Sequence, residues 1–209
     1  MRKSNVKESG GKFKNSLRRP IPGDEIMALT ESDYRKVGKG GKAPDFSLPS
    51  TDGHTLSLQQ LKGRNATLII FMCNHCPYVK PKIDEMMRIA ADYRSKGLSV
   101  IGINSNNEAT HPDDSFDNMK KIVKERNINF PYLRDESQEV AKAYGATCTP
   151  DPFLFDKDLK LVFHSRIDDT HGQDPATKHE MHNAIAQFMA TGAISMREKP
   201  SMGCNIKWK

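Results

Sequence analysis

Two runs of apolar residues stand out in the first half of the chain. The stretches ATLIIFM, residues 66–72, and LSVIGIN, residues 98–104, are rich in β-branched side chains, as expected of strands covered on both faces. Between them, apolar side chains recur at helical spacing: Val79, Ile83, Met86, Ala90 and Tyr93. The spacing predicts a helix from Pro77 to Tyr93 that Pro81 bends near its first turn and Gly97 ends. This pattern predicts a strand–helix–strand unit with parallel strands.

The second half of the chain continues with helices and then changes to a hairpin. Residues 113–127 and 137–145 each predict a helix, whereas residues 152–166, PFLFDKDLKLVFHSR, predict two strands joined by a tight turn at Asp156–Asp158. The last helix has an apolar stripe that we interpret as core: Met181, Ala184, Ile185, Phe188 and Met189. Short strands are expected earlier, around the turn at Thr51–Gly53. The order predicts one α/β domain.

Cys73 and Cys76 follow the first buried strand directly, in CNHC. Zinc usually takes four ligands in two close pairs, and here one CxxC stands apart, although His75 could add a ligand. The two thiols could also be small buried core residues. Their place at the end of a central strand, where open α/β sheets bind ligands, favours a redox pair.

The spacing explains how such a pair would work. At a helix amino terminus the free N–H groups and the dipole favour an anion, so Cys73 is expected to ionise near neutral pH. His75, when protonated, would strengthen this; an exposed loop residue is an equally good interpretation. Two intervening residues let Cys76 reach Cys73 and resolve a mixed disulfide.

The chain resembles the thioredoxin superfamily: CxxC lies between a strand and a helix, Pro81 follows five residues later, and Thr149-Pro150 precedes the hairpin. The resemblance implies a thioredoxin-like three-layer α/β/α sandwich with an N-terminal strand extension and an inserted helix. It also implies a cis Pro150 beside the active disulfide, with Thr149 and Pro150 as a substrate-docking edge. A trans proline that simply starts a strand is the alternative.

Three separated motifs resemble a narrower group. KAPDFSLPSTDGHTLSLQQLKG is similar to the amino-terminal signature of the alkyl hydroperoxide reductase and thiol-specific antioxidant group, and CNHCPYVK and YGATCTPDPFLFD with the terminal GCNIKWK resemble its peroxiredoxin-like branch. The peroxiredoxin pattern P-x-x-x-T-x-x-C, aligned on Cys76, has Ile69 and Cys73 at its proline and threonine. Thioredoxin has a buried carboxylate where this chain has Thr67. Another group or water must then move the proton; Asp45 is a weak candidate, and a turn residue is its simpler interpretation.

Two further cysteines can join the pair. Cys148, two residues before Pro150, should lie on the same face as CxxC, and a packed small residue is the alternative. Cys204 lies in a tail with no helical pattern, and on a flexible arm it could reach the site. We therefore hypothesise a disulfide relay from Cys73–Cys76 to Cys148 or Cys204. Trp208 is expected to dock the tail on the body.

Charge is concentrated at the amino terminus. Of the net +6, residues 1–22 carry seven Lys or Arg against one acid, Glu8. We expect a basic, disordered segment over 1–38, a thioredoxin-like domain over 39–196 and a C-terminal tail over 197–209. With neither a long apolar run nor a secretory signal, the chain is expected to be cytoplasmic and to bind no membrane. One Trp makes no stacking platform, so nucleic acid is not an expected partner.

Four histidines follow the start of the hairpin. His179 and His182 lie three residues apart on a helix, which suits a metal but favours a solvated face. Copper-handling relatives in the superfamily that the chain resembles pair two nearby cysteines with a distant histidine, and His164 and His171 would be the candidates for that histidine in a minority hypothesis of copper or zinc delivery.

The sequence thus predicts a thiol:disulfide oxidoreductase with Cys73 as nucleophile, Cys76 as resolving thiol and His75 as a tuning residue. It needs no cofactor and no metal. Its partners would be a protein or small-molecule disulfide and a thiol electron donor. A peroxiredoxin-like peroxidase acting on peroxide is the alternative. The sequence does not indicate which oligomeric state the protein has.

Overall fold

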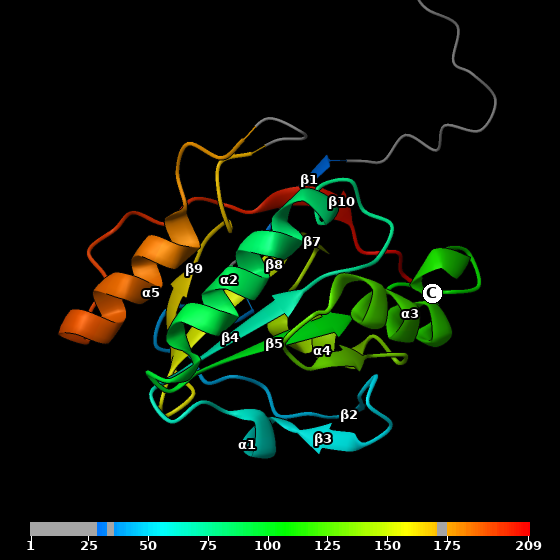
Figure 1. The fold of residues 1–209 in the computed structure, drawn as a ribbon, viewed down its shortest axis with the longest axis horizontal. Coiled ribbons are helices and arrows are strands. Elements are labelled where there is room, and N and C mark those ends of the chain that lie inside the picture. Colours follow the sequence, from blue (N-terminus) through cyan, green and yellow to red (C-terminus); the bar gives the residue numbers. More distant parts are fainter. Residues whose placement is uncertain (1–28, 33–35, 171–174) are drawn as a thin grey trace, which may run out of the picture.

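The computed structural model describes residues 29–32, 36–170 and 175–209. Its centre is a five-stranded sheet in the order β6-β5-β4-β8-β9 (Figure 1). The parallel strands are β4 (Ala66–Phe71), β5 (Leu98–Asn104) and β6 (Tyr132–Arg134). The predicted hairpin, β8 (Asp151–Asp156) and β9 (Leu161–His164), adds to β4 antiparallel. The two apolar runs are therefore neighbours, as expected.

Helices cover both faces of this sheet. One face packs against α2 (Ile83–Arg94), α3 (Phe116–Arg126) and α5 (Glu180–Thr191). The other packs against α1 (Leu58–Leu61), α4 (Glu139–Tyr144) and the hairpin of β2 (Ser47–Pro49) and β3 (Thr55–Ser57). Along β4 the side chains alternate between the two cores, with Leu68 and Ile70 on one side and Ile69 and Phe71 on the other. The three-layer prediction is confirmed, and none of the described helices is long and apolar enough to cross a membrane.

The helix after CxxC begins later than predicted. Residues 77–79 form a turn, Lys80–Lys82 form one turn of 3₁₀ helix that contains Pro81, and α2 starts only at Ile83. The N–H groups of Val79 and Lys80 donate to the carbonyl of Cys76, at 3.0 and 3.1 Å. The expected α-helix terminus at Cys73 is therefore wrong, because a proline at position 81 favours a separate turn before the regular helix.

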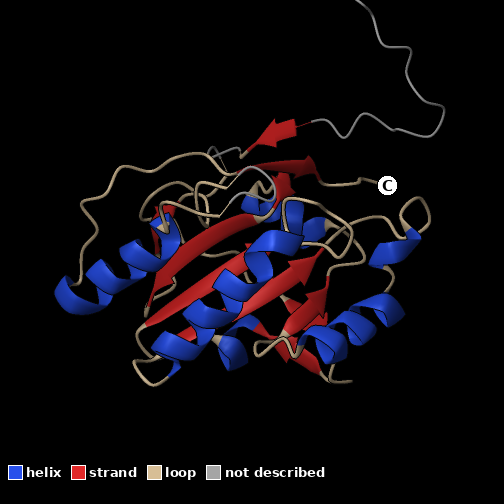
Figure 2. Cartoon of the chain, turned by 45° about the horizontal axis from the view of Figure 1, so that its top comes forward, coloured by secondary structure: helices blue, strands red, loops and turns tan. Residues whose placement is uncertain are grey.

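A second, three-stranded sheet brings residues 29–31 and residues 202–205 together beside residues 148–149. It has the order β1-β10-β7, with β1 (Leu29–Glu31), β10 (Met202–Asn205) and β7 (Cys148–Thr149) all antiparallel. In Figure 1 the red strand β10 runs beside β1 near the start of α2, and Figure 2 brings this end of the molecule forward.

This small sheet corrects two expectations. Disorder over 1–38 is wrong for Leu29–Glu31, while residues 1–28 lie outside the described residues. A flexible arm over 197–209 is also wrong, because residues 202–205 are a strand and Cys204 is buried. Trp208 has an exposed fraction of 41%, whereas Ile206 is buried, so docking of the tail by Trp208 stays a prediction.

Candidate active site

Cys73 and Cys76 lie at the carboxyl end of β4, as predicted. Both side chains are buried, at 1% and 0% exposure, and all four cysteines are free thiols. The two thiols shift each other's pKa in opposite directions, because one negative charge is held more easily on one sulfur than on both. The strand thus delivers a contiguous pair of sulfurs to the edge where β4, β7 and the turn before α2 meet.

The Thr149-Pro150 peptide is cis, as the resemblance implied, and it contacts both sulfurs. The Thr149 side-chain oxygen lies 3.3 Å from Cys73 Sγ, and the Thr149 carbonyl oxygen lies 3.4 Å from Cys76 Sγ. Thr149 and Pro150 therefore form the wall of the site, on the β7 side.

The expected docking edge is occupied by the chain itself. β10 pairs with β7, placing Cys204 opposite Thr149 and Asn205 opposite Cys148. An external peptide cannot pair with Thr149 on this side while β10 is there. The tail forms the strand that a substrate chain was expected to add, so docking of a substrate at Thr149-Pro150 stays a prediction that requires β10 to move.

Cys204 and Cys148 lie on neighbouring strands but face different groups. Cys204 Sγ lies 3.0 Å from Cys76 Sγ. Cys148 Sγ instead lies 3.9 Å from the Ser32 hydroxyl and 3.8 Å from the Ser201 carbonyl. Of the two candidates for the relay, the structure brings only Cys204 to the CxxC pair.

His75 is paired with a carboxylate that the sequence analysis missed. Its Nδ1 lies 2.5 Å from Asp114 Oδ2, and its ring stacks on His111 with centroids 5.0 Å apart. Asp114 is fully buried and also accepts hydrogen bonds from the Asn74 backbone N–H at 2.6 Å and from the Asn106 amide at 2.8 Å. His75 is thus a positioned, half-buried residue rather than an exposed loop residue.

Each partner shifts the other's pKa. The hydrogen bond to Asp114 raises the pKa of His75 and outweighs its partial burial. Burial by itself raises the pKa of Asp114, but the hydrogen bonds from His75 and Asn106 outweigh it and hold that pKa below its usual range. The pair therefore keeps a proton on His75 beside Cys73, because the charged forms of the two side chains stabilise each other.

The pKa shifts of the two thiols are the reverse of those expected: the pKa of Cys76, not that of Cys73, is lowered. Hydrogen bonds from Cys204 and Cys73 hold the pKa of Cys76 well below that of a free thiol. Burial and the neighbouring Cys76 raise the pKa of Cys73. The expected ionisation of Cys73 at a helix terminus is not supported, since α2 begins at Ile83; the opposite pKa shifts favour Cys76 over Cys73 as the thiolate.

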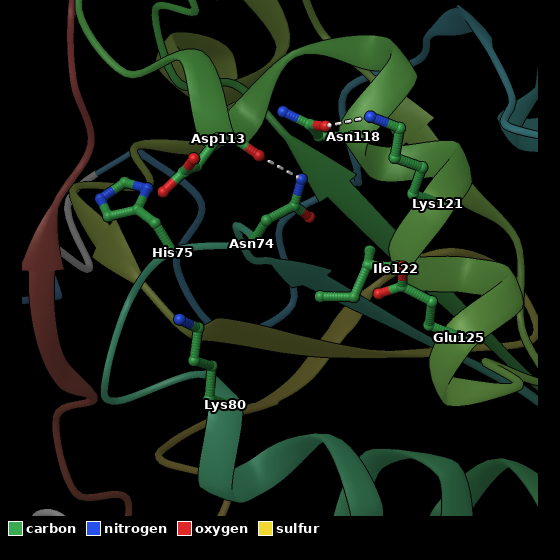
Figure 3. A pocket seen from close by; sticks show the side chains of 8 residues that line it. All are labelled: Asn74, His75, Lys80, Asp113, Asn118, Lys121, Ile122 and Glu125. Atoms are coloured by element: carbon green, nitrogen blue, oxygen red, sulfur yellow. Dashed lines mark hydrogen bonds between the residues drawn. The ribbon is translucent and has the colours of Figure 1, made fainter.

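A polar pocket of about 280 Å³ opens beside CxxC (Figure 3). Asn74 and His75 line one end of it with Asp113, and Lys121 of α3 lines the other. Asn74 is fixed there by hydrogen bonds to the Asp113 carbonyl at 2.8 Å and from the Tyr132 hydroxyl at 3.0 Å. The two residues inside the CxxC motif therefore face an open space large enough for a small molecule.

The metal hypothesis does not fit this arrangement. Ligand atoms of Cys73, His75 and Asp114 lie within 4.8 Å of one another. Two ligands of one tetrahedral zinc are separated by about 3.4 Å, whereas His75 and Asp114 approach to 2.5 Å, the distance of a shared proton. His164 is bonded to Asp151 at 2.6 Å, and His171 lies outside the described residues.

The histidine pair on the last helix also has carboxylate partners. His179 lies 3.3 Å from Glu85, and His182 lies 3.1 Å from Asp92, both on α2. These contacts tie α5 to α2 and support the surface interpretation.

A family model decides which group the chain belongs to. The AhpC/TSA family model matches residues 39–164, more than half of the chain and all of the central sheet. The chain belongs to the AhpC/TSA family. This confirms the resemblance found in the amino-terminal signature and in the motif around CxxC.

Solved structures of relatives share the fold. An uncharacterized conserved protein from Geobacillus kaustophilus is 44% identical, with a TM-score of 0.82 over 88% of this chain and 97% of that one. The thioredoxin domain of a thiol-disulfide oxidoreductase from Bacteroides vulgatus is 18% identical, with a TM-score of 0.58 over 73% of this chain and 99% of that one. The AhpC/TSA chain therefore has the thioredoxin-like α/β fold.

Named relatives fall into two groups. The thiol-disulfide oxidoreductase ResA of Bacillus thuringiensis is 27% identical over 147 residues, 69% of this chain and 78% of that protein. The chloroplastic peroxiredoxin Q of Populus jackii is 26% identical over 136 residues, 65% of this chain and 59% of that protein. Both names describe redox proteins, and they differ in the oxidant.

This member of the AhpC/TSA family takes its buried carboxylate from an unexpected place. Thr67, in the thioredoxin carboxylate position, is buried and accepts a hydrogen bond from the Gly63 N–H at 3.0 Å. Asp114 supplies a carboxylate from the other side of the site, whereas Asp45 is exposed and accepts from the Phe46 N–H, as a turn residue does. The sequence places Asp114 only in the helix predicted over 113–127, because nothing in the spacing links position 114 to position 75.

Proposed function

We propose that this protein exchanges a dithiol for a disulfide through Cys73 and Cys76. The observation that carries the proposal is the contact of Thr149 with both sulfurs of the CxxC pair, through its side-chain oxygen to Cys73 and its carbonyl oxygen to Cys76. Thr149 thus contacts the two thiols from one side and holds them next to each other. The pair is then preorganised for disulfide formation.

The protein is an oxidoreductase of the AhpC/TSA family that acts on thiols, in keeping with relatives of both named groups. The finer proposal concerns which sulfur does what. Cys73 lies between the His75–Asp114 pair and Cys76, and Cys76 lies between Cys73 and Cys204. The pocket adjoins Asn74 and His75, the two residues between the cysteines, so an external disulfide would approach the motif from this side, with Cys73 as the attacking thiol of the proposal.

The first half-reaction forms a mixed disulfide. Cys73 Sγ attacks one sulfur of the substrate, and its proton passes to Cys76, the thiol with the lowered pKa. The substrate S–S bond breaks, and the leaving sulfur takes a proton from His75. The charge held on Cys76 thus activates Cys73 as the nucleophile, so the raised pKa of Cys73 in the resting state does not prevent attack.

The second half-reaction closes the internal disulfide. Cys76 Sγ attacks Cys73 Sγ, the mixed disulfide breaks, and the second substrate thiolate leaves with the Cys76 proton. One substrate disulfide becomes two thiols while Cys73 and Cys76 lose two electrons. An external thiol then restores the reduced pair.

Substrate size follows from the covered edge. β10 occupies the position on β7 where a protein chain would pair, and Cys73 is almost fully buried. The pocket beside His75 suits a small disulfide, and a protein disulfide would have to displace β10 first. The cytoplasmic, reducing setting expected from the sequence is part of this proposal.

A thiol peroxidase is the second candidate, and two observations favour it. Cys76 carries the lowered pKa, which a peroxide-reactive thiolate needs, and peroxiredoxin Q is among the relatives. In this alternative Cys76 attacks the peroxide O–O bond, becomes a sulfenic acid, and condenses with a neighbouring thiol.

One experiment separates the two candidates. Reduced wild type, Cys73→Ser, Cys76→Ser and the matched control Cys148→Ser are mixed with glutathione disulfide or with hydrogen peroxide, and free-thiol loss is followed in time. Disulfide exchange predicts fast loss with glutathione disulfide that requires Cys73. Fast loss with peroxide that survives Cys73→Ser but not Cys76→Ser would instead establish the peroxidase.

A further inference from the structure

The tail is fixed tightly around the site. Beyond β10, the Ile206 N–H donates to the Thr147 carbonyl at 2.9 Å, and the Lys207 N–H donates to Asn106 Oδ1 at 2.9 Å. The Lys207 carbonyl accepts from the Asn107 N–H and from the Gln138 amide, both at 2.8 Å. Asn106 also donates to Asp114, so the tail shares a hydrogen-bond network with the His75 side of the site.

Gly203 lets β10 approach the cis peptide. A Cβ at this position would lie 2.0 Å from the Thr149 carbonyl oxygen and 2.7 Å from the Thr149 carbonyl carbon. Only a glycine permits this approach, because both clashing atoms are backbone. The close approach brings the next residue, Cys204, over the CxxC pair.

Cys204 and Cys76 are in position to form a bond. Their sulfurs lie 3.0 Å apart, closer than a normal non-bonded contact, and a disulfide requires about 2.05 Å. A shift of about 1 Å therefore closes the bond. Cys148 has no such neighbour among the described contacts, since it faces Ser32, Ser201 and the Pro150 carbonyl.

We propose that Cys204 is a third redox thiol, which converts the Cys73–Cys76 disulfide into a Cys76–Cys204 disulfide by thiol–disulfide exchange. The inference rests on the proposed function for the formation of that first disulfide. Cys204 Sγ attacks Cys76 Sγ, the Cys73–Cys76 bond breaks, and Cys73 leaves with the proton of Cys204. No electrons are gained or lost in this step; the disulfide moves to Cys76–Cys204, and Cys73 becomes a free thiol again.

The charges favour this order of events. In the reduced site the hydrogen bond to Cys76 raises the pKa of Cys204, which keeps Cys204 protonated and idle. Once Cys76 is in a disulfide, that cause disappears; burial still raises the pKa of Cys204, while nearby Lys207 favours its thiolate. Oxidation of Cys73 and Cys76 thus lowers the pKa of Cys204 and favours its attack.

The relay leaves a chemical signature. After transfer, Cys73 can attack a second disulfide substrate, but Cys76 is engaged and cannot resolve the adduct. With excess substrate and no reductant, the protein should therefore end with a Cys76–Cys204 disulfide and a mixed disulfide on Cys73. Without Cys204 it should end with Cys73–Cys76 and no adduct.

The test is non-reducing peptide mapping of the full chain after reaction with excess glutathione disulfide and an acid quench. Wild type and the control Cys148→Ser should each carry one glutathione on Cys73 and the Cys76–Cys204 bond. Cys204→Ser should show a Cys73–Cys76 bond without glutathione. Cys73→Ser, which keeps both relay thiols, should form Cys76–Cys204 on mild oxidation even if Cys204→Ser folds poorly.

Two outcomes overturn the relay while the proposed function stands. Wild type could end with Cys73–Cys76 and a free Cys204, or Cys73→Ser could fail to form Cys76–Cys204 under oxidation. If glutathione disulfide oxidises neither Cys73 nor Cys76 in wild type, the proposed function itself fails. The two failures are therefore distinguishable on the same map.

Discussion

The two sides of the CxxC pair are built from different chemistry. On the loop side, His75 Nδ1 is hydrogen-bonded to Asp114 Oδ2 at 2.5 Å, and Asp114 also accepts from the Asn106 amide. On the tail side, β7 and β10 bring a carbonyl and the Cys204 thiol against Cys76, at 3.4 and 3.0 Å. The loop side thus supplies a group that can donate a proton, and the tail side supplies a thiol that can form a disulfide. Cys73 and Cys76 lie between the two sides.

This division explains why both cysteines can be buried and still react. A buried thiolate is costly unless donors surround it, and here two thiols donate to Cys76. A buried leaving sulfur needs a proton, and His75 holds one. The separation predicts that variants on one side change proton behaviour, whereas variants on the other change which disulfide forms.

The largest effect is expected from Cys76→Ser, which removes the residue common to both sides. It deprives Cys73 of its proton acceptor and of its resolving thiol, so turnover of a disulfide substrate should fall by roughly 100-fold or more. Steady-state reduction of glutathione disulfide, with a dithiol as electron donor, measures it. Cys148→Ser is the matched control and should keep activity close to wild type; equal losses in the two variants would contradict the assignment.

Gly203→Ala tests the tail side alone. The added methyl group must push β10 away from the Thr149 carbonyl, so the free energy of unfolding should fall by about 1–3 kcal/mol. Cys76–Cys204 should then form poorly, because the two sulfurs separate. Denaturant unfolding and peptide mapping provide the two readouts.

Gly38→Ala is the control for that variant. A Cβ at Gly38 meets nothing within 4 Å, so its stability should stay within about 0.5 kcal/mol of wild type. A Gly203→Ala protein that is as stable as Gly38→Ala and still forms Cys76–Cys204 would show that close approach is not required.

Asp114→Asn tests the loop side alone. The hydrogen bond from His75 loses its charged acceptor, so the pKa of His75 should fall, and each unit of that fall corresponds to about 1.4 kcal/mol of pairing free energy. NMR titration of the His75 ring measures it. Asp92→Asn, which affects the surface pair with His182, is the control and should leave the His75 titration unchanged.

The stability difference between wild type and Asp114→Asn should depend on pH in both directions. The raised pKa of His75 gives stability that is lost as pH rises through that pKa, and the lowered pKa of Asp114 gives stability that is lost as pH falls through it. The difference should therefore be largest between about pH 4 and 6.5. A difference that is independent of pH would mean that the pair carries no charge.

Local patterns predicted the scaffold of this site well. Apolar spacing located β4, β5, α2 and α5, and the CxxC motif fell at the carboxyl end of β4 as expected. These features depend on residues close in sequence, whose periodicity reports burial directly. The prediction of the first buried strand therefore placed Cys73 and Cys76 correctly, at its carboxyl end.

The two sides of the site could not be predicted in the same way. His75 meets Asp114 across 39 residues, and Cys76 meets Cys204 across 128, so each contact depends on how distant elements pack. A strand of four residues around Gly203 has no alternating pattern to report it. The glycine was the one local signal, because a glycine beside a cysteine can mark a close backbone approach.

Trp208→Ala is expected to have the smallest effect on the free energy of unfolding. It tests which residue of the tail holds β10 in place. Its side chain is 41% exposed, whereas Ile206 is buried in the core below α4. Trp208→Ala should change the free energy of unfolding by less than about 0.5 kcal/mol and leave Cys76–Cys204 formation intact. Ile206→Ala should cost about 2–5 kcal/mol, because it opens a cavity beneath β10. If instead Trp208→Ala destabilises the protein and impairs the disulfide, the tail is held from its exposed end, and Cys204 owes its position to the indole ring rather than to the strand.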